Sequence, residues 1–199
     1  MAIRPFYGTQ TVSGSVQPVF GTAVTAAVTP PADQFSGVLT PGSNETQCSL
    51  TVTSTKGFLP GDRVAVGPTA AFKPGIVASG SIADQGTVKS ITSGTVMVVQ
   101  GLKNSHAATG EWCVLNDSVS SVHIRPVVTA AAVYIGNAST VSSSDPSLLD
   151  ILPIVAAAGT APGYVFDTES AGVAQPVQLS EFWLIGTASD QFLARFVTI

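Results

Sequence analysis

Charged residues are scarce in this chain. Asp, Glu, Lys and Arg make up 10% of its 199 residues, whereas roughly 25% is usual in soluble globular proteins. The eight Lys and Arg are scattered singly and the net charge is -4, so the basic stripe of a nucleic-acid-binding protein is missing. We therefore expect no nucleic-acid partner and a surface with little charge to keep it hydrated.

Long apolar runs are also missing, although hydrophobic residues reach 45% of the chain. A membrane span requires roughly 18 consecutive apolar residues, and the richest stretches, VVTAAAVYIG and ILPIVAAAG, are too short. The opening stretch MAIRPFYGTQTVSG has no apolar segment typical of a secretory signal. We expect no membrane partner and a protein that is made and used without export.

Cysteine and histidine occur only twice each. Cys48 and Cys113 lie in predicted strands, where they either face each other across a sheet or stand as two buried thiols, the commoner arrangement. Neither His106 nor His123 has the sequence spacing of a metal ligand relative to a cysteine or the other histidine. We expect no metal site and no cofactor.

What the chain does have is a period-2 alternation of apolar and polar residues, which predicts an all-β protein. Only SDPSLLDILPI, residues 144–154, favours a helical turn, with Ser144 or Asp145 as its N-cap and Pro146 at its first position. The predicted strands, rich in Val, Ile, Thr and aromatic residues, are 10–16, 19–28, 47–53, 62–67, 86–91, 94–99, 111–115, 121–128, 131–136, 164–167, 181–186 and 191–198.

Composition divides the chain into three parts. Residues 1–45 are rich in proline and poor in large apolar residues, which indicates an extended N-terminal arm. Residues 46–125 and 126–199 each hold a series of short strands, whose spacing suits small barrels or sandwiches. We treat them as two small β modules and predict a small β-barrel module over 46–125 and a β-sandwich-like C-terminal module over 126–199. The arm is either a solvated tail or a segment that docks on another subunit, and its large apolar residues favour docking. The predicted anchors of the arm are Ile3, Phe6, Tyr7 and Phe20.

The stretch STKGFLPGDRVAVG, residues 54–67, places glycines beside basic residues, as phosphate-binding loops do. It lacks both the G-x-x-x-x-G-K-[ST] and the G-x-G-x-x-G order, and a strand pattern follows where those loops require a helix. Pro60 and Gly61 suit the two corners of a type II turn, and Phe58 and Leu59 supply apolar residues for it to bury. We predict a turn at this place and no anion site.

The order of LTVTSTKGFLPGDRVAVG, GTVKSITSGTVMVVQGL and HAATGEWCVLND resembles a small β-barrel module of structural proteins of tailed bacteriophages, with its "GF-x-x-GD-x-V" turn and "GTV-x-SI-x-x-x-TV" hairpin. VYIGNASTVSSSDPSLLDILPI and FWLIGTASDQFLARFVTI are similar to later stretches of such virion proteins. These motifs consist of turn and core residues and name no reaction.

The resemblance implies a non-enzymatic virion protein, namely a decoration or cement protein that stabilises the capsid through contacts between subunits. Its partners would be the major capsid protein or other virion subunits. It would form a homo-oligomer, with a trimer preferred because shells offer three-fold positions. Its location would be the virion, assembled in the cytoplasm of the bacterial host.

Two other functions remain open from the sequence. A head-fibre, tail-fibre adaptor or baseplate protein would bind a host-surface glycan through exposed aromatic residues, for which Trp112, Trp183 and Tyr164 are the candidates; each also fits a core or an interface. A polysaccharide hydrolase would need two carboxylates in a cleft. Asp167 and Glu169 are the one suggestive pair, but a solvated strand end is by far the commoner explanation for such a pair, so we expect no catalytic residues.

Overall fold

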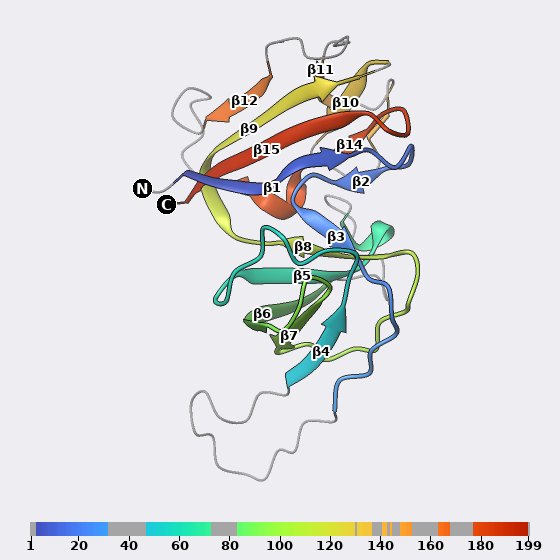
Figure 1. Cartoon of the computed structure of the whole chain (residues 1–199), viewed down its shortest axis with the longest axis vertical. Coiled ribbons are helices and arrows are strands. Elements are labelled where there is room, and N and C mark those ends of the chain that lie inside the picture. The colour runs from blue at the N-terminus through green and yellow to red at the C-terminus, as the bar shows by residue number, and fades with distance from the viewer. Residues whose placement is uncertain are drawn as a thin grey trace. The chain divides into compact units, whose positions relative to one another are not determined.

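A computed structural model of the chain describes residues 3–31, 47–72, 83–129, 131–136, 141, 142, 144, 148–152, 163–167 and 177–198. These residues form strands and two short 3-10 helices, which confirms the all-β prediction (Figure 1). No helix in the described ranges is long and apolar enough to cross a membrane. The strands are β1 (Ile3–Thr11), β2 (Gln17–Pro18), β3 (Gly21–Ala23), β4 (Gln47–Thr51), β5 (Arg63–Pro68), β6 (Asp84–Ile91), β7 (Val96–Gln100), β8 (Glu111–Leu115), β9 (Ser118–Val128), β10 (Val133–Gly136), β11 (Leu148–Leu152), β12 (Tyr164–Asp167), β13 (Val177–Gln178), β14 (Trp183–Ile185) and β15 (Gln191–Thr198), and the 3-10 helices are η1 (Thr69–Phe72) and η2 (Leu179–Glu181).

The chain divides into two compact units whose limits differ from the three predicted parts. Unit 1 comprises Met1–Gly21, Phe72–Ile76 and Asn116–Ile199, and unit 2 comprises Thr22–Ala71 and Val77–Leu115. Unit 2 is therefore inserted in sequence between segments of unit 1. The predicted arm, residues 1–45, does not stand apart, because its first half belongs to the same unit as the C-terminal strands.

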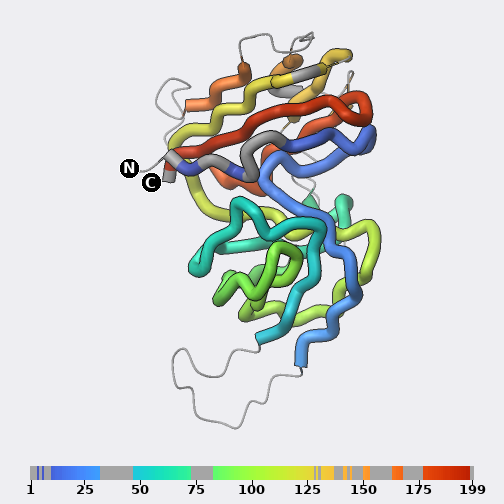
Figure 2. Tube along the Cα trace, viewed as in Figure 1, coloured from blue at the N-terminus to red at the C-terminus, as the bar shows by residue number. Residues whose placement is uncertain are grey.

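Unit 1 contains a five-stranded sheet and a four-stranded sheet. The order of the first is β1-β15-β9-β12 with β13 also paired to β9, and the order of the second is β11-β10-β14-β2. Strand β1 runs antiparallel to β15, from Ile3 opposite Val197 to Thr11 opposite Gln191, so the two ends of the chain lie side by side (Figure 2). The N-terminal segment is thus an edge strand of its own chain, which corrects the expectation of an arm directed at a neighbour.

Aromatic side chains fill the core of unit 1. The Phe20 ring, which follows β2, packs edge to face against Phe6 of β1 and Phe196 of β15, with centroids 5.7 and 5.5 Å apart. Phe182, which precedes β14, contacts Phe20 at 6.2 Å and Phe166 of β12 at 6.0 Å. These contacts join residues of the five-stranded sheet to residues that flank strands of the four-stranded one, so the two sheets share one core.

The helical turn predicted over residues 144–154 is wrong where the structure describes it. Residues 148–152 form strand β11, which pairs antiparallel with β10, placing Leu152 opposite Val133 and Ile151 opposite Tyr134. Leu152 is buried and Ile151 is exposed, which is the alternation of a strand that covers a core with one face. Helix-capping residues of the kind that suggested a helix stabilise a fold by less than strand pairing and the burial of apolar side chains do.

Unit 2 is a six-stranded antiparallel sheet that curls on itself in Figure 1. Its order is β3-β8-β5-β6-β7-β4. At the two ends of this order, the Thr25 N–H donates to the Thr51 carbonyl and the Thr53 N–H donates to the Ala23 carbonyl, both at 2.9 Å. Backbone hydrogen bonds therefore link the last residues of β3 and β4, and the residues just after them, across the two ends of the sheet.

The two cysteines both belong to unit 2, where Cys113 lies on β8 and Cys48 on β4. Both are buried and unpaired by a disulfide. Burial raises the pKa of the Cys113 thiol, and burial together with the Asp84 carboxylate raises that of Cys48. The interpretation as two buried thiols is confirmed.

Candidate functional site

The loop at residues 54–67 is a turn, as predicted. Asp62 N–H donates to the Leu59 carbonyl at 3.1 Å, and Gly61, at the third turn position, has φ +97°, as a type II turn requires. The Asp62 carboxylate accepts the Leu59 N–H at 2.7 Å. The loop thus directs a backbone donor at its own carboxylate rather than at a ligand. Phe58 is buried, whereas Leu59 is 53% exposed, so only one of the two predicted apolar residues is inside.

A second turn in unit 1 uses the same device. The Asp190 N–H donates to the Thr187 carbonyl, and the Asp190 carboxylate accepts the Thr187 N–H at 3.0 Å. Its third position is Ser189, whose φ of +79° is the only positive φ of a described residue other than glycine. Asp62 and Asp190 are both buried. These carboxylates therefore hold turns together and contribute little charge to the surface.

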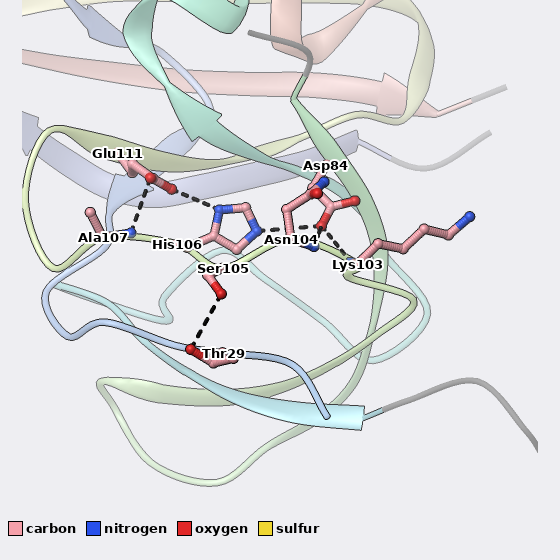
Figure 3. A network of polar contacts seen from close by, with 8 residues as sticks. All are labelled: Thr29, Asp84, Lys103, Asn104, Ser105, His106, Ala107 and Glu111. Atoms are coloured by element: carbon pink, nitrogen blue, oxygen red, sulfur yellow. Dashed lines mark hydrogen bonds and ion pairs between the residues drawn. The ribbon is translucent and has the colours of Figure 1, made fainter. Parts of the chain in front are cut away.

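A buried polar network in unit 2 surrounds His106 (Figure 3). Its Nδ1 lies 2.7 Å from Glu111 Oε2, and its Nε2 lies 3.5 Å from Asp84 Oδ2. Asp84 Oδ2 also accepts the backbone N–H groups of Lys103 and Asn104, and Glu111 Oε1 accepts that of Ala107. The three side chains thus attach the segment between β7 and β8 to strand β6, which carries Asp84, and to strand β8, which carries Glu111.

The chemistry open to this network is limited by its burial. His106 is 5% exposed, and its Nε2 makes no hydrogen bond to any residue that the structure describes. A carboxylate lies beside each ring nitrogen. No group of three metal-ligating side chains with suitable geometry occurs among the described residues. The network stabilises the local structure, because a substrate could not reach the buried ring.

A cavity of about 370 Å³ opens on unit 1 over strands β9, β12 and β15. Its polar lining comes from His123 and Arg125 of β9 and Arg195 of β15. His123 stands opposite both Val165 of β12 and Arg195, so these three side chains share one face of the sheet. That face is opposite the one on which the neighbouring residues of β9 and β15 are buried.

Burial and nearby charged groups shift the pKa of His123, which lines this cavity. Partial burial and the adjacent Arg195 guanidinium lower the pKa of His123, and the Asp167 carboxylate offsets part of this effect. Arg195 Nη2 lies 3.5 Å from His123 Nδ1. Tyr164 also lines the cavity, and burial, with a smaller contribution from the Asp150 carboxylate, raises its pKa to about 12. Neutral imidazole is therefore the favoured form beside two arginines.

The three aromatic residues proposed for glycan binding differ in their burial and contacts. Trp183 is fully buried, donates its Nε1–H to the Ser180 carbonyl at 2.9 Å and contacts Phe72 with ring centroids 5.2 Å apart. Trp112 is half-buried in unit 2 and donates to Thr69 Oγ1 at 3.2 Å. Tyr164, in unit 1, is the one that lines a cavity. Trp183 is therefore a core residue.

The predicted arm anchors also lie inside the molecule where the structure describes them. Phe6 and Phe20 are fully buried against residues of their own unit, because β1 pairs within the chain and carries its apolar side chains into that core. Ile3 and Tyr7 are backbone members of β1, and their side chains lie outside what the structure describes. Of the possible carboxylate pair, Asp167 ends β12, and Glu169 lies outside the described residues.

The sequence did not point to Arg125, Arg195 or His123 as one group. The available signal was local: His123 and Arg125 stand two apart on a predicted strand, and so do Leu193 and Arg195, which places each pair on one face. Bringing the two pairs together required the register of β9 with β15, which has bulges and cannot be read from either strand alone.

No protein-family model matches this chain, and no curated protein matches it. Among solved structures, the chain is similar to VP17, a capsid protein of bacteriophage P23-77, with 14% sequence identity and a TM-score of 0.21. The similarity covers 99% of this chain and 78% of that chain. A TM-score of this size supports no inference, so the function proposed below rests on this chain's own residues.

Proposed function

We propose that this protein is a non-enzymatic structural component of a virion, and specifically a decoration or cement protein of a tailed-phage capsid. The observation that carries the proposal is that several of the chain's few charged side chains are buried. Asp62 and Asp190 are buried in turns, Asp84 is buried at the start of strand β6, and His106 is buried between two carboxylates. A surface from which even these charges are withdrawn suits a protein that packs against neighbours.

The architecture supports the same function. The turn at residues 59–62 and the hairpin of β6 and β7 are the parts that resemble the small β-barrel module of phage structural proteins. In unit 2 the turn leads into β5, and β5, β6 and β7 belong to one curled sheet whose end strands are linked by backbone hydrogen bonds. We infer that unit 2 is such a closed barrel and that unit 1, with two sheets around one aromatic core, is a β-sandwich.

A decoration protein would act by adding buried surface across joints between shell subunits. A stable contact buries about 1,600 Å² in total, and symmetry repeats that contact over the particle. Many such contacts act together, so the shell is harder to open than any single contact suggests. The partners would be the major capsid protein and further copies of this chain, with a trimer at three-fold positions as the proposed state.

Add-back to stripped particles tests this function. Particles from which the protein has been removed by mild heating should recover it from solution up to a fixed number of copies, and should then resist a higher temperature before releasing their DNA. Release temperature is measured with a DNA-binding dye. Saturable binding together with a raised release temperature supports decoration, whereas binding without added resistance indicates a different virion role.

A second candidate is a fibre or baseplate protein that binds a host glycan, and Tyr164 beside the cavity is the observation that favours it. A glycan array separates the two. A glycan reader should bind a defined saccharide and lose that binding with Tyr164→Ala, while Trp112→Ala in unit 2 serves as the matched aromatic control. Absence of glycan binding with saturable binding to shells favours decoration.

A further inference from the structure

Two arginine side chains line the cavity on unit 1. Arg125 and Arg195 are both exposed, and within the described part of the chain no carboxylate pairs with either of them. Arg195 Nη2 has a polar contact with His123 Nδ1, at 3.5 Å. Two guanidinium groups on adjacent strands, two residues apart across the β9–β15 register, can converge on a single oxygen-rich group.

The remaining surface of the cavity is apolar. Val165 of β12 is 57% exposed, whereas the other residues of this strand are half-buried. Leu193 of β15 stands opposite Arg125 and is half-buried. Gly163 keeps the backbone close, because a Cβ there would lie 2.9 Å from the Arg125 Cα atom. The cavity thus combines two cations with an aliphatic wall.

We propose that this cavity binds the carboxylate of an Asp or Glu side chain on a partner protein, with an apolar neighbour of that residue packed against Val165 and Leu193. The proposal rests on the proposed structural role and names the chemistry of the contact. Each guanidinium donates hydrogen bonds to the carboxylate, and His123 lies beside the pair. Charge-assisted bonds of this kind are the stronger ones in proteins, and the partly covered setting reduces screening by water.

Charge argues for an acidic protein segment over other anions. A polyphosphate chain such as DNA would be repelled by the net charge of -4 and would gain little from two arginines, because nucleic-acid affinity grows with the number of phosphates neutralised. The mostly aliphatic wall also suits a peptide better than a sugar-phosphate backbone. The occupant we propose is a side chain of a different protein, and a second copy of this chain is the alternative that the test below separates.

Peptide titration of the whole protein tests the site. The probes are acetyl-Val-Glu-Val-amide and its neutral match acetyl-Val-Gln-Val-amide, followed by NMR of the His123 ring protons. The acidic peptide should bind and raise the pKa of His123, because an added negative charge opposes the effect of Arg195. Arg125→Gln and Arg195→Gln should each weaken binding about tenfold, whereas Lys103→Gln, which removes a cation from unit 2, should leave it unchanged.

The proposal would be overturned by equal binding of the neutral peptide, by equal weakening in Lys103→Gln, or by tighter binding of a short oligonucleotide than of the acidic peptide. Concentration-dependent self-association that Arg195→Gln abolishes would also overturn it, by identifying a second copy as the occupant. The outcome is separable from the virion role. If the protein binds stripped particles but not the acidic peptide, the virion role stands and this binding site is wrong. If it binds the peptide but not the particles, the binding site stands and the virion role is wrong.

Discussion

Phe20 meets Phe196 edge to face, with ring centroids 5.5 Å apart. One residue comes from the N-terminal segment and the other from the last strand, and both are fully buried. Between them in sequence lies the whole of unit 2. Unit 1 therefore cannot complete its core until both ends of the chain are in place.

Phe20→Ala should lower the free energy of unfolding of unit 1 by about 3–5 kcal/mol, the cost usual for emptying a buried Phe site. Ile151→Ala, which truncates a side chain that is 48% exposed in the same unit, should change it by less than about 1 kcal/mol. Urea unfolding followed by tryptophan fluorescence measures both. Similar effects of the two substitutions would contradict the assignment of Phe20 to the core.

Ser189→Gly should stabilise the protein by about 0.5–1 kcal/mol, because glycine adopts a positive φ without the steric cost that a Cβ adds. Ser189→Ala keeps the Cβ and should give no gain, which makes it the matched control. Thermal unfolding of the three proteins provides the comparison. A loss of stability in the glycine variant would mean that the serine side chain is needed in the turn.

His106→Ala should destabilise unit 2 by about 2 kcal/mol, since it removes a hydrogen bond to a carboxylate and leaves Asp84 without its ring neighbour. Ser105→Ala, one residue earlier and exposed, is the control and should have little effect. Hydrogen exchange of the amides of Lys103, Asn104 and Ala107 should speed up in the His106 variant. Unchanged exchange there would show that the ring does not secure this segment.

Stability should also depend on pH through His123. Its pKa is lower in the folded protein than the ordinary value of about 6.5, so below that value the unfolded chain binds the proton first. Stability is therefore full above pH 6.5 and falls as the pH drops through the folded-state value. Arg195→Gln should move the pKa of His123 upward and flatten this dependence, as NMR titration and urea unfolding at pH 5 and 7 would show. An unchanged pKa of His123 in the Arg195→Gln variant would exclude Arg195 as a cause of its lowered value.

Local patterns in the sequence predicted much of the fold. Strands β8, β12 and β15 have the predicted bounds, because alternation and flanking turn residues are local signals. The turn at 59–62 followed from Pro60 and Gly61, whose backbone preferences act without tertiary help. Strand β1 was missed because Pro5 lies within it and its stabilising partner, β15, is at the other end of the chain. Strand β11 was missed for the same reason, since its pairing with β10 outweighs a local capping signal.

The candidate sites depended even more on tertiary structure. His106 and Glu111 are close in sequence, but Asp84 joins them only through the pairing of β5 with both β6 and β8. Arg125 and Arg195 meet through a strand register that includes bulges. The burial of Phe6 and Phe20 could not be read from composition, because an apolar segment docks equally well on its own chain or on a neighbour.

The most direct test of the virion role is the number of copies of this chain in purified particles, measured by quantitative mass spectrometry against the major shell subunit. A decoration protein should be present at a fixed ratio set by the symmetry of the shell and unchanged between preparations. Absence of the chain from purified particles would contradict the account.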